Sequence, residues 1–511
     1  MEKFYITTAI DYVNAAPHLG HALEKIQADV IARYQRLLAK DVFFLTGTDE
    51  HGAKVARAAQ AQGENPEEFA DEISENFRNL IKELNISNND FIRTSDKKRH
   101  WPGAEAFWKK LAAKGDIYKG NYKGLYCLGC EAFITKKDLV DGKCRWHGSQ
   151  ELEEINEENY FFKLSAYQKE IKKAIVSGEL KIIPESRKNE VLSLIEEGLE
   201  DVSFSRPAKD IPWGIPVPGD KTQTMYVWAD ALTNYISALG YGSANEKKFE
   251  KYWPADIHVI GKDILRFHAL IWPGMLISTG FDLPKTLFVH GHITMAGKRM
   301  SKTSGNVIDP FDLMNRYGVD ALRYYLSREI SVTEDGDLTE EKFKESYNAN
   351  LANGLGNCVS RVLKMAVDYF GGLIKKPEET LLAQIPFKKS EKEFFSVPYV
   401  FDKFIWPEYQ KHMDNLELNK AMDIVWSAIS QLDGYIQDYQ PFKLIKTDKD
   451  KTQAILWNLV FGLANIAWML KTFMPETSDK ISAAIGIDEK TKDEWVEFKV
   501  KTIEPLFLRK P

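Results

Sequence analysis

Two short stretches, far apart in the chain, carry side chains suited to nucleotide chemistry. His18 and His21 flank Gly20 directly after a strand-like run, and a glycine-flanked loop from 297 to 306 contains Arg299 and Lys302. Imidazoles at a helix start could bind phosphate oxygens beside unpaired backbone N–H groups and the positive end of the helix dipole. A mobile cationic loop could stabilise charge at the α-phosphate of ATP. Alone, each stretch could be a capping motif or a solvated loop; together they predict an ATP site.

Aromatic and apolar residues after other predicted strands indicate a pocket. A linear apolar or thioether side chain fits such a pocket, because sulfur packs well against rings. Asp49, at a strand end, could hold an α-amino group. Simple core packing explains the same residues equally well, so the pattern alone leaves both interpretations open. The set comprises Tyr12, Trp228, Tyr235, Ile264, His268 and Trp272.

Three of the four cysteines lie in one short segment, with a histidine. Cys127 and Cys130 form one pair, and Cys144 and His147 form a second pair with the same spacing. Two such pairs supply the four ligands of a tetrahedral Zn²⁺. Because all four positions are filled by protein, we expect a structural zinc ion rather than a catalytic one. Cys358 lies in a helical segment and is expected to be buried.

The bulk composition restricts the class of protein. The chain has 511 residues, is 44% hydrophobic and carries a formal net charge of −6. A nucleic-acid partner would therefore be bound on local patches rather than by overall charge. The sequence has no run of 18 or more apolar residues, so no membrane span is expected. The first residues lack the features of a signal peptide. We expect a cytoplasmic protein without a membrane partner.

The order of predicted elements places the candidate residues at strand ends. A strand at 4–10, a helix from Pro17 to about residue 39 and a strand at 41–46 form a βαβ unit with a parallel sheet. Pro17 suits the first helical position. Further strands are expected at 256–260 and 286–292, and helices without strands from 338 to 487. The predicted fold is α/β, a Rossmann-type parallel sheet with an inserted domain and then an all-α helix bundle. The expected domains are 1–115, 116–221, 222–337 and 338–511.

On these residues, the chain resembles the class I aminoacyl-tRNA synthetases, and within them the methionyl-tRNA synthetases. The resemblance covers essentially the whole chain. His18-Leu19-Gly20-His21 is similar to the "HIGH" signature, and Arg299-Met300-Ser301-Lys302-Thr303 is similar to the "KMSKS" signature. The resemblance implies that His18, His21 and Lys302 are catalytic, with Lys302 as the chief transition-state cation. It also implies that Mg²⁺ accompanies ATP. The residues implied for ATP are His18, Gly20, His21, Glu24, Gly261, Asp263, Ile293, Arg299 and Lys302.

The methionine assignment depends on four further segments, 9–12, 47–52, 226–231 and 261–268, which line the methionine pocket in the family. Asp49 is implied for the amino group. Asp11 stands where many members have proline. The residues implied for methionine are Ala9, Ile10, Tyr12, Asp49, Trp228, Ala231, Tyr235, Ile264 and His268.

The resemblance also extends to the inserted and helical parts. The cysteine pairs are similar to the single-knuckle connective domain, with one zinc ion per chain. Asn357 and Arg361 match positions that read the CAU anticodon, and Phe442 stands where a tryptophan commonly stacks on an anticodon base. The residues alone only weakly suggest base binding there. A C-terminal domain that supports dimers in some members is not seen, which favours a monomer.

The resemblance implies a ligase that activates methionine with ATP and transfers it to tRNA(Met) for translation. Three alternatives remain. A class I synthetase for another apolar amino acid is disfavoured by the aromatic pocket and by the lack of a very large editing insertion. A small-molecule nucleotidyltransferase would leave the helical half without a role. A non-catalytic tRNA-binding protein is disfavoured by the intact residues His18, His21, Asp49 and Lys302.

Overall fold

The predicted N-terminal βαβ unit is present. Strands β1 (Lys3–Thr8) and β3 (Asp41–Asp49) flank helix α1 (Leu19–Leu37) in sequence. The two strands pair in parallel, with Lys3 opposite Asp41 and Thr7 opposite Leu45. Most of their residues are buried, as expected for strands covered on both faces.

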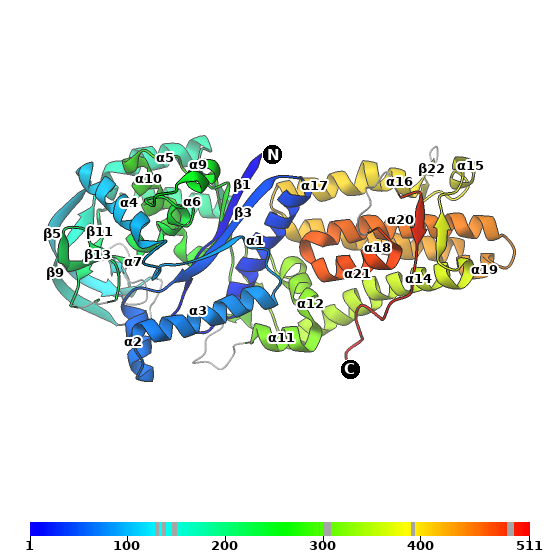
Figure 1. Ribbon diagram of the computed structural model, residues 1–511, viewed down its shortest axis with the longest axis horizontal. Coiled ribbons are helices and arrows are strands. Elements are labelled where there is room, and N and C mark those ends of the chain that lie inside the picture. Colours follow the sequence, from blue (N-terminus) through cyan, green and yellow to red (C-terminus); the bar gives the residue numbers. More distant parts are fainter. Residues whose placement is uncertain are drawn as a thin grey trace. The chain divides into compact units, whose positions relative to one another are not determined.

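The computed structural model describes residues 1–127, 132–134, 139–145, 151–209, 211, 213–295, 297–299, 308–389, 394–487 and 495–511. The chain divides into two compact units, Met1–His292 and Ile293–Pro511. Figure 1 shows the sheet of the first unit with α1 and α3 labelled beside it, and the helices of the second unit.

The main sheet of the first unit has the strand order β10-β16-β15-β1-β3, and β2 and β4 also pair with β3. All of its pairings are parallel in the described residues. Strands β1 and β15 are neighbours, but the next main-sheet strand after β1 is β3, towards one edge of the sheet, and the next after β15 is β16, towards the other edge. This reversal is the topological switch point at which open α/β sheets bind ligands. The other strands are β2 (Asp11–Tyr12), β4 (Asp90–Arg93), β10 (Lys181–Ile183), β15 (Ile257–Gly261) and β16 (Thr286–His290).

Helices cover this sheet and enclose the main apolar core. That core joins residues from segments as distant as Tyr5, Phe107 and Trp272. Between β15 and α10 the chain makes a short 3₁₀ turn, η3 (Lys262–Ile264), and a wider π-type turn, η4 (Phe267–Ile271). The helices are α2 (Ala53–Gln62), α3 (Pro66–Glu83), α4 (Trp101–Ala113), α5 (Gln168–Ser177), α6 (Glu185–Glu196), α7 (Val227–Ala231), α8 (Asn234–Ser237), α9 (Lys247–Tyr252) and α10 (Trp272–Thr279).

The segment predicted as an insertion contains antiparallel strands. Strands β5 (Ile117–Cys127) and β9 (Leu152–Phe162) pair along their whole length, from Ile117 opposite Phe162 to Cys127 opposite Leu152. The predicted domain boundaries at 116 and 221 stay predictions. The remaining strands here are β6 (Ala132–Ile134), β7 (Leu139–Val140), β8 (Lys143–Cys144), β11 (Val202–Ser203), β12 (Ser205–Pro207), β13 (Pro216–Val217) and β14 (Asp220–Met225).

The second unit is mainly helical, as predicted, but the expectation of no strands after residue 338 was wrong. Strand β20 (Leu373–Lys375) pairs with β23 (Glu497–Lys499), and β21 (Lys388–Lys389) pairs with β22 (Phe394–Phe395). Strands of two or three residues are too short to show an alternating pattern. The unit begins with β17 (Ile293–Met295), β18 (Lys298–Arg299) and β19 (Gly336–Asp337).

The helices of the second unit form its core. One of them, α20 (Lys449–Phe473), is long and apolar enough to cross a membrane by composition, but 89% of its most apolar window is buried inside the unit. This burial is typical of a core helix. The others are α11 (Pro310–Tyr317), α12 (Val319–Tyr324), α13 (Glu340–Ser346), α14 (Asn357–Phe370), α15 (Glu379–Leu382), α16 (Val397–Val400), α17 (Trp406–Asp414), α18 (Leu418–Tyr439), α19 (Pro441–Leu444) and α21 (Pro475–Ile485).

Candidate functional site

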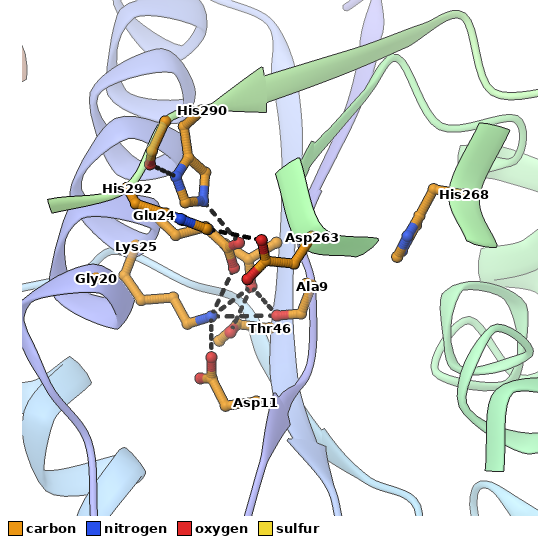
Figure 2. Close-up of polar contacts among 12 residues, drawn as sticks. Ala9, Asp11, Gly20, Glu24, Lys25, Thr46, Asp263, His268, His290 and His292 are labelled. Atoms are coloured by element: carbon orange, nitrogen blue, oxygen red, sulfur yellow. Dashed lines mark hydrogen bonds and ion pairs between the residues drawn. The ribbon is translucent and has the colours of Figure 1, made fainter. Parts of the chain in front are cut away.

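The predicted site residues of the first unit gather where the parallel strands end. Thr8, the last residue of β1, lies opposite Val259 of β15, and the N–H of Ala9 donates to the carbonyl of Val259 at 3.0 Å. Gly261 ends β15, opposite His290 at the end of β16. The segments that follow β1, β15 and β16 therefore meet at the switch point, as Figure 2 shows.

Helix α1 begins at Leu19, two residues later than predicted, with His18 as its N-cap. Pro17 is therefore not the first helical residue. The Nδ1 atom of His18 accepts the N–H of Gly20 at 3.1 Å, and Nδ1 of His21 accepts the N–H of His18 at 3.1 Å. These reciprocal bonds satisfy two backbone donors that the helix leaves unpaired. The side chain of His18 thus takes the capping position, and the proline stays outside the helix.

The two imidazoles of this motif are stacked. Their ring centroids are 3.8 Å apart, with an angle of 20° between the planes. Burial lowers the pKa of His21 well below its usual value, and the neighbouring His18, Lys25 and His290 lower it further. His21 is therefore neutral near pH 7. Because its Nδ1 accepts a hydrogen bond, its proton is on Nε2, where it can be donated.

Gly20 lies against the ring of His18. A Cβ atom at Gly20 would come within 2.9 Å of Cε1 and 3.1 Å of Nδ1 of His18. A side chain at position 20 would therefore displace the imidazole of His18. The glycine is required for the observed arrangement of the histidine pair.

Polar residues next to α1 connect it to the ends of β15 and β16. Nε2 of His290 lies 3.1 Å from Oε2 of Glu24, and Nε2 of His292 lies 3.0 Å from Oδ1 of Asp263 (Figure 2). Burial raises the pKa of Glu24, but Lys25 and His290 outweigh burial and hold that pKa below its usual value. Glu24 is therefore an anion, ready to accept hydrogen bonds.

Six of the nine residues predicted for methionine belong to the main core cluster of the first unit or pack against it. Ala9 and Tyr235 belong to the main core cluster of the first unit, and Ile10, Tyr12, Trp228 and Ile264 pack against that cluster. Tyr12 pairs with Asp49 across β2 and β3, which places Asp49 next to Tyr12. Ala231 ends α7, which also carries Trp228.

His268 is held in one tautomer at this place. Its Nδ1 lies 3.0 Å from the carbonyl of Ile264 and therefore carries the proton. Its Nε2 then accepts the hydroxyl of Tyr235 at 2.7 Å. Burial lowers the pKa of His268 to about 4, and burial raises the pKa of Tyr235.

Trp228 completes the aromatic lining. Its ring stacks on Phe267 with centroids 3.7 Å apart and lies edge-on to His268 at 6.1 Å. With His268 and Tyr235 both uncharged, the lining is neutral and mainly aromatic. Trp272, which the same helical spacing indicated, is fully buried and serves as core packing.

Two further polar clusters were missed in the sequence. Asp230 binds Nδ1 of His51 and Nε2 of His100, each at 2.6 Å. Burial raises the pKa of Asp230, but the two imidazoles outweigh burial and hold it below the usual value. Lys25 forms the second cluster with Asp11 and Glu24. The Asp230 contacts join residues 130 and 179 positions apart, which no local sequence pattern links.

The cationic loop belongs to the second unit. Lys302 lies outside the residues that the structure describes. Arg299 ends β18 and pairs with Thr294, and Ile293 begins β17 and is buried. The structure leaves the roles of these three residues untested.

The predicted anticodon residues are found on two helices of the second unit. Asn357 begins α14 and is exposed. Arg361 is one turn further on, and its Nη1 lies 3.4 Å from Oδ1 of Asp433 on α18. Phe442, on α19, is 39% exposed, which is high for a large apolar side chain and leaves its ring accessible.

Half of the predicted zinc site can be described. Cys127 ends β5 and Cys144 ends β8, and both are buried in one small cluster with Ile134. Cys130 and His147 lie outside the described residues. Among the residues that the structure does describe, no group of three or more His, Cys, Asp or Glu side chains could hold a metal ion. Two buried cysteines in one cluster fit half of the four-ligand set.

Comparisons with known proteins match both parts of the chain. The family described as tRNA synthetases class I (M) matches residues 4–153 and 135–363. The family described as anticodon binding domain of methionyl tRNA ligase matches residues 403–506.

Curated relatives are similar over nearly the whole chain. Methionine–tRNA ligase of Thermotoga maritima is 42% identical, covering 97% of this chain and 77% of the relative. Methionine–tRNA ligase of Brucella suis is 41% identical, covering 95% and 92%. Among solved structures, the Mycobacterium tuberculosis methionyl-tRNA synthetase in complex with methionyl-adenylate has a TM-score of 0.89 and 37% identity, covering 97% of this chain and 96% of that one. The apo form of the same enzyme has a TM-score of 0.84 and 33% identity.

Proposed function

The chain belongs to the methionyl-tRNA synthetase family of class I, and on that premise we propose which of its residues carry the reaction. A synthetase of this family activates methionine with ATP and charges tRNA with it. The observation that supports a residue assignment most directly is the meeting of the strand ends of β1, β15 and β16 at the start of α1.

In the first step, the carboxylate of methionine attacks the α-phosphorus of ATP. A P–O bond to the carboxylate forms, the bond to the bridging oxygen breaks, and pyrophosphate leaves. The carboxylate is ionised near pH 7, so no base is needed. We assign the protonated Nε2 of His21, together with His18, to the phosphate oxygens at the start of α1. Lys302 supplies the cation that stabilises the transition state.

The amino acid is selected by the neutral aromatic lining. Asp49 binds the ammonium group of methionine, while Tyr12, Trp228, Ala231, Tyr235 and His268 surround the thioether, with Ala9, Ile10 and Ile264 beside them. An uncharged lining suits a side chain that has no charge and only a weak acceptor. In the second step, a ribose hydroxyl at the 3′ end of tRNA attacks the acyl carbon and AMP leaves.

The remaining nucleotide contacts are assigned to residues around this edge. Gly20, Glu24, Gly261 and Asp263 would bind the adenosine part, and the family resemblance also assigns Ile293 and Arg299 to the nucleotide. Mg²⁺ would accompany the triphosphate. The cytoplasm as the location and a monomer as the assembly also stay predictions.

We propose zinc for the cluster that contains Cys127 and Cys144, with Cys130 and His147 as the other ligands. When bound, the ion would cross-link the tip of the β5–β9 pair. Metal analysis of the purified protein should find about one zinc per chain. Replacement of Cys144 by serine should remove it, whereas replacement of the buried Cys358 should not. Full zinc content after Cys144→Ser would refute the assignment.

The decisive experiment is ATP–pyrophosphate exchange without tRNA, measured with each proteinogenic amino acid in turn. We expect exchange with methionine. Lys302→Ala should lower kcat far more than methionine affinity, because its charge acts mainly in the transition state. Exchange with a different amino acid would overturn the pocket assignment. A folded protein without any exchange would indicate a non-catalytic tRNA-binding protein instead.

A further inference from the structure

The ammonium group of Lys25 is buried where the two substrate sites meet. Lys25 has no exposed surface. Its Nζ lies 3.1 Å from Oγ1 of Thr8, 3.1 Å from the carbonyl of Ala9, 3.0 Å from Oδ1 of Asp11 and 3.0 Å from Oε1 of Glu24. An ammonium has three protons, so these four oxygens occupy all of its donors. Lys25 therefore acts through its neighbours and does not touch a substrate.

The neighbours of Lys25 belong to two different binding segments. Thr8 ends β1, and Ala9 and Asp11, labelled in Figure 2, follow it in the segment assigned to methionine. Glu24 lies on α1 and is assigned to the nucleotide; its second oxygen lies 3.1 Å from Nε2 of His290. A single cation thus joins the methionine segment to the nucleotide helix.

The charges of this cluster depend on one another. Burial acts against the charged form of Lys25, but Asp11 and Glu24 outweigh burial and raise its pKa. Burial raises the pKa of Asp11 to about 7, although Lys25 acts in the opposite direction. Oδ2 of Asp11 is buried and has no hydrogen-bond partner among the described residues. Removing one member would leave another charge buried and poorly paired.

We propose that Lys25, together with Asp11, is a positioning residue that fixes the methionine segment 9–12 against Glu24, so that binding of the nucleotide strengthens binding of methionine. The inference rests on the proposed function, because it uses the assignment of these two segments to the two substrates. Any such coupling is reciprocal, so methionine strengthens nucleotide binding by the same factor.

The test measures that factor directly. Methionine is titrated by tryptophan fluorescence, alone and with a non-hydrolysable ATP analogue, in the wild type and in Lys25→Met. Met has a similar length and no charge. In the wild type we expect the analogue to lower the Kd of methionine by at least about 5-fold. In Lys25→Met that factor should fall towards one, and kcat for exchange should fall by about 10-fold or more.

A control lysine is available on β1, the strand whose end Lys25 contacts. Lys3, at the other end of β1, binds the carbonyl of Tyr252 at 2.9 Å and Asp256 at 3.1 Å. Lys3→Met removes a partly buried ammonium from β1 itself, at the end of the strand away from both substrate segments. We expect it to lower stability and to leave the coupling factor unchanged. A loss of coupling in Lys3→Met would show that any weakening of β1 has this effect, and would overturn the inference.

A second variant reduces the problem of unpaired charge. In Asp11→Asn/Lys25→Met the Lys25–Asp11 pair is neutral and Glu24 keeps His290 as a partner, so the protein should fold even if Lys25→Met does not. We expect it to lack the coupling as well. A coupling factor equal to that of the wild type in this variant would overturn the positioning role. Absence of methionine-dependent exchange in the wild type would instead refute the proposed function, so the two failures are distinguishable.

Discussion

Gly20 shows how one missing carbon atom determines the geometry of the phosphate site. Alanine at this position would place Cβ 2.9 Å from Cε1 of His18, and the exposed ring can respond by moving away. We expect Gly20→Ala to lower kcat for ATP–pyrophosphate exchange by about 10- to 100-fold, since displacements of about 1 Å have such effects. The melting temperature should change little, because the displaced ring is not part of the core.

Gly434 offers a control for this substitution. It also lies inside a helix, α18, and an added Cβ there would meet no atom within 4 Å. Gly434→Ala should leave exchange unchanged. If Gly20→Ala were as active as Gly434→Ala, His18 would not act at the phosphates in the position that the structure shows.

His268 predicts a specific dependence of stability on pH. Its pKa is about 4 in the folded protein, against an ordinary value of 6.5. Between these values the unfolded chain binds a proton that the folded protein does not, so stability falls as the pH drops through this window. The shift corresponds to about 3 kcal/mol at most. Below about pH 4 both states are protonated, and this residue has no further effect.

The variant His268→Gln tests this linkage, because glutamine stays neutral at every pH. We expect the free energy of unfolding, measured by chemical denaturation, to fall less steeply for His268→Gln than for the wild type between about pH 6.5 and pH 4.5. Above about pH 7 the difference between the two proteins should be constant. If the free energy of unfolding changed with pH in the same way for both proteins, His268 would titrate normally, and the argument for a neutral lining would fail.

The residues that sequence alone could identify are those in local motifs. His18, His21 and Asp49 were predicted as site residues because they lie at the ends of recognisable strands and helices, and their roles stay predictions. Lys25 and Asp230 were missed, because the sequence around a polar residue does not show whether the fold brings a charged partner to it. Their partners come from segments that only the folded sheet brings together.

At the scale of elements, the edge of the sheet depends on how closely β3 and β4 pair. Gly47 lies opposite Ile92, and a Cβ at position 47 would come within 2.0 Å of the carbonyl oxygen of Ile92. Backbone cannot move aside as a side chain can. Gly47→Ala should therefore force the two strands apart and shift Asp49, which ends β3.

We expect Gly47→Ala to lower the free energy of unfolding by about 1–3 kcal/mol or more and to raise the KM for methionine. Gly120→Ala, in strand β5, is the control, because its Cβ would meet Phe161 at an ordinary distance of 3.4 Å. Denaturation curves and exchange kinetics of the two variants provide the comparison. Equal stability of the two variants would show that β4 moves away from position 47 without loss of stability.

Periodicity predicted the elements of the sheet well and their ends less well. β1, α1 and β3 were predicted because buried strands and an amphipathic helix have strong patterns over many residues. The start of α1 was misplaced because a proline is an ordinary first helical residue, whereas capping by His18 depends on side-chain geometry. The β20–β23 pair joins short segments more than 100 residues apart, for which sequence has no signal.

At the scale of the whole chain, methionine recognition and anticodon reading are assigned to residues of different units. The first unit contains the residues proposed to bind methionine, the histidine pair at α1 and the buried Lys25 cluster. The second contains the helices with the predicted anticodon residues. Adenylate formation needs no tRNA, so a defect confined to anticodon reading should spare it.

Arg361→Ala tests this separation. Loss of a charged hydrogen bond to a base costs about 1.5–3 kcal/mol, so kcat/KM for charging of tRNA(Met) should fall by about 10- to 100-fold. Methionine-dependent exchange should stay at the wild-type rate. The folded unit should tolerate the change, because the Arg361–Asp433 pair is partly exposed and contributes at most about 1 kcal/mol.

Lys364→Ala supplies the matched control for this last prediction. Lys364 lies three residues further along α14 and pairs with Asp368 on the exposed face of the same helix. Its removal also deletes one positive charge from α14, so it measures the general electrostatic contribution of this helix to tRNA binding. We expect a much smaller loss of charging than for Arg361→Ala. Equal losses would mean that α14 attracts tRNA by charge alone, and a loss of exchange in Arg361→Ala would mean that the two tasks are not separable.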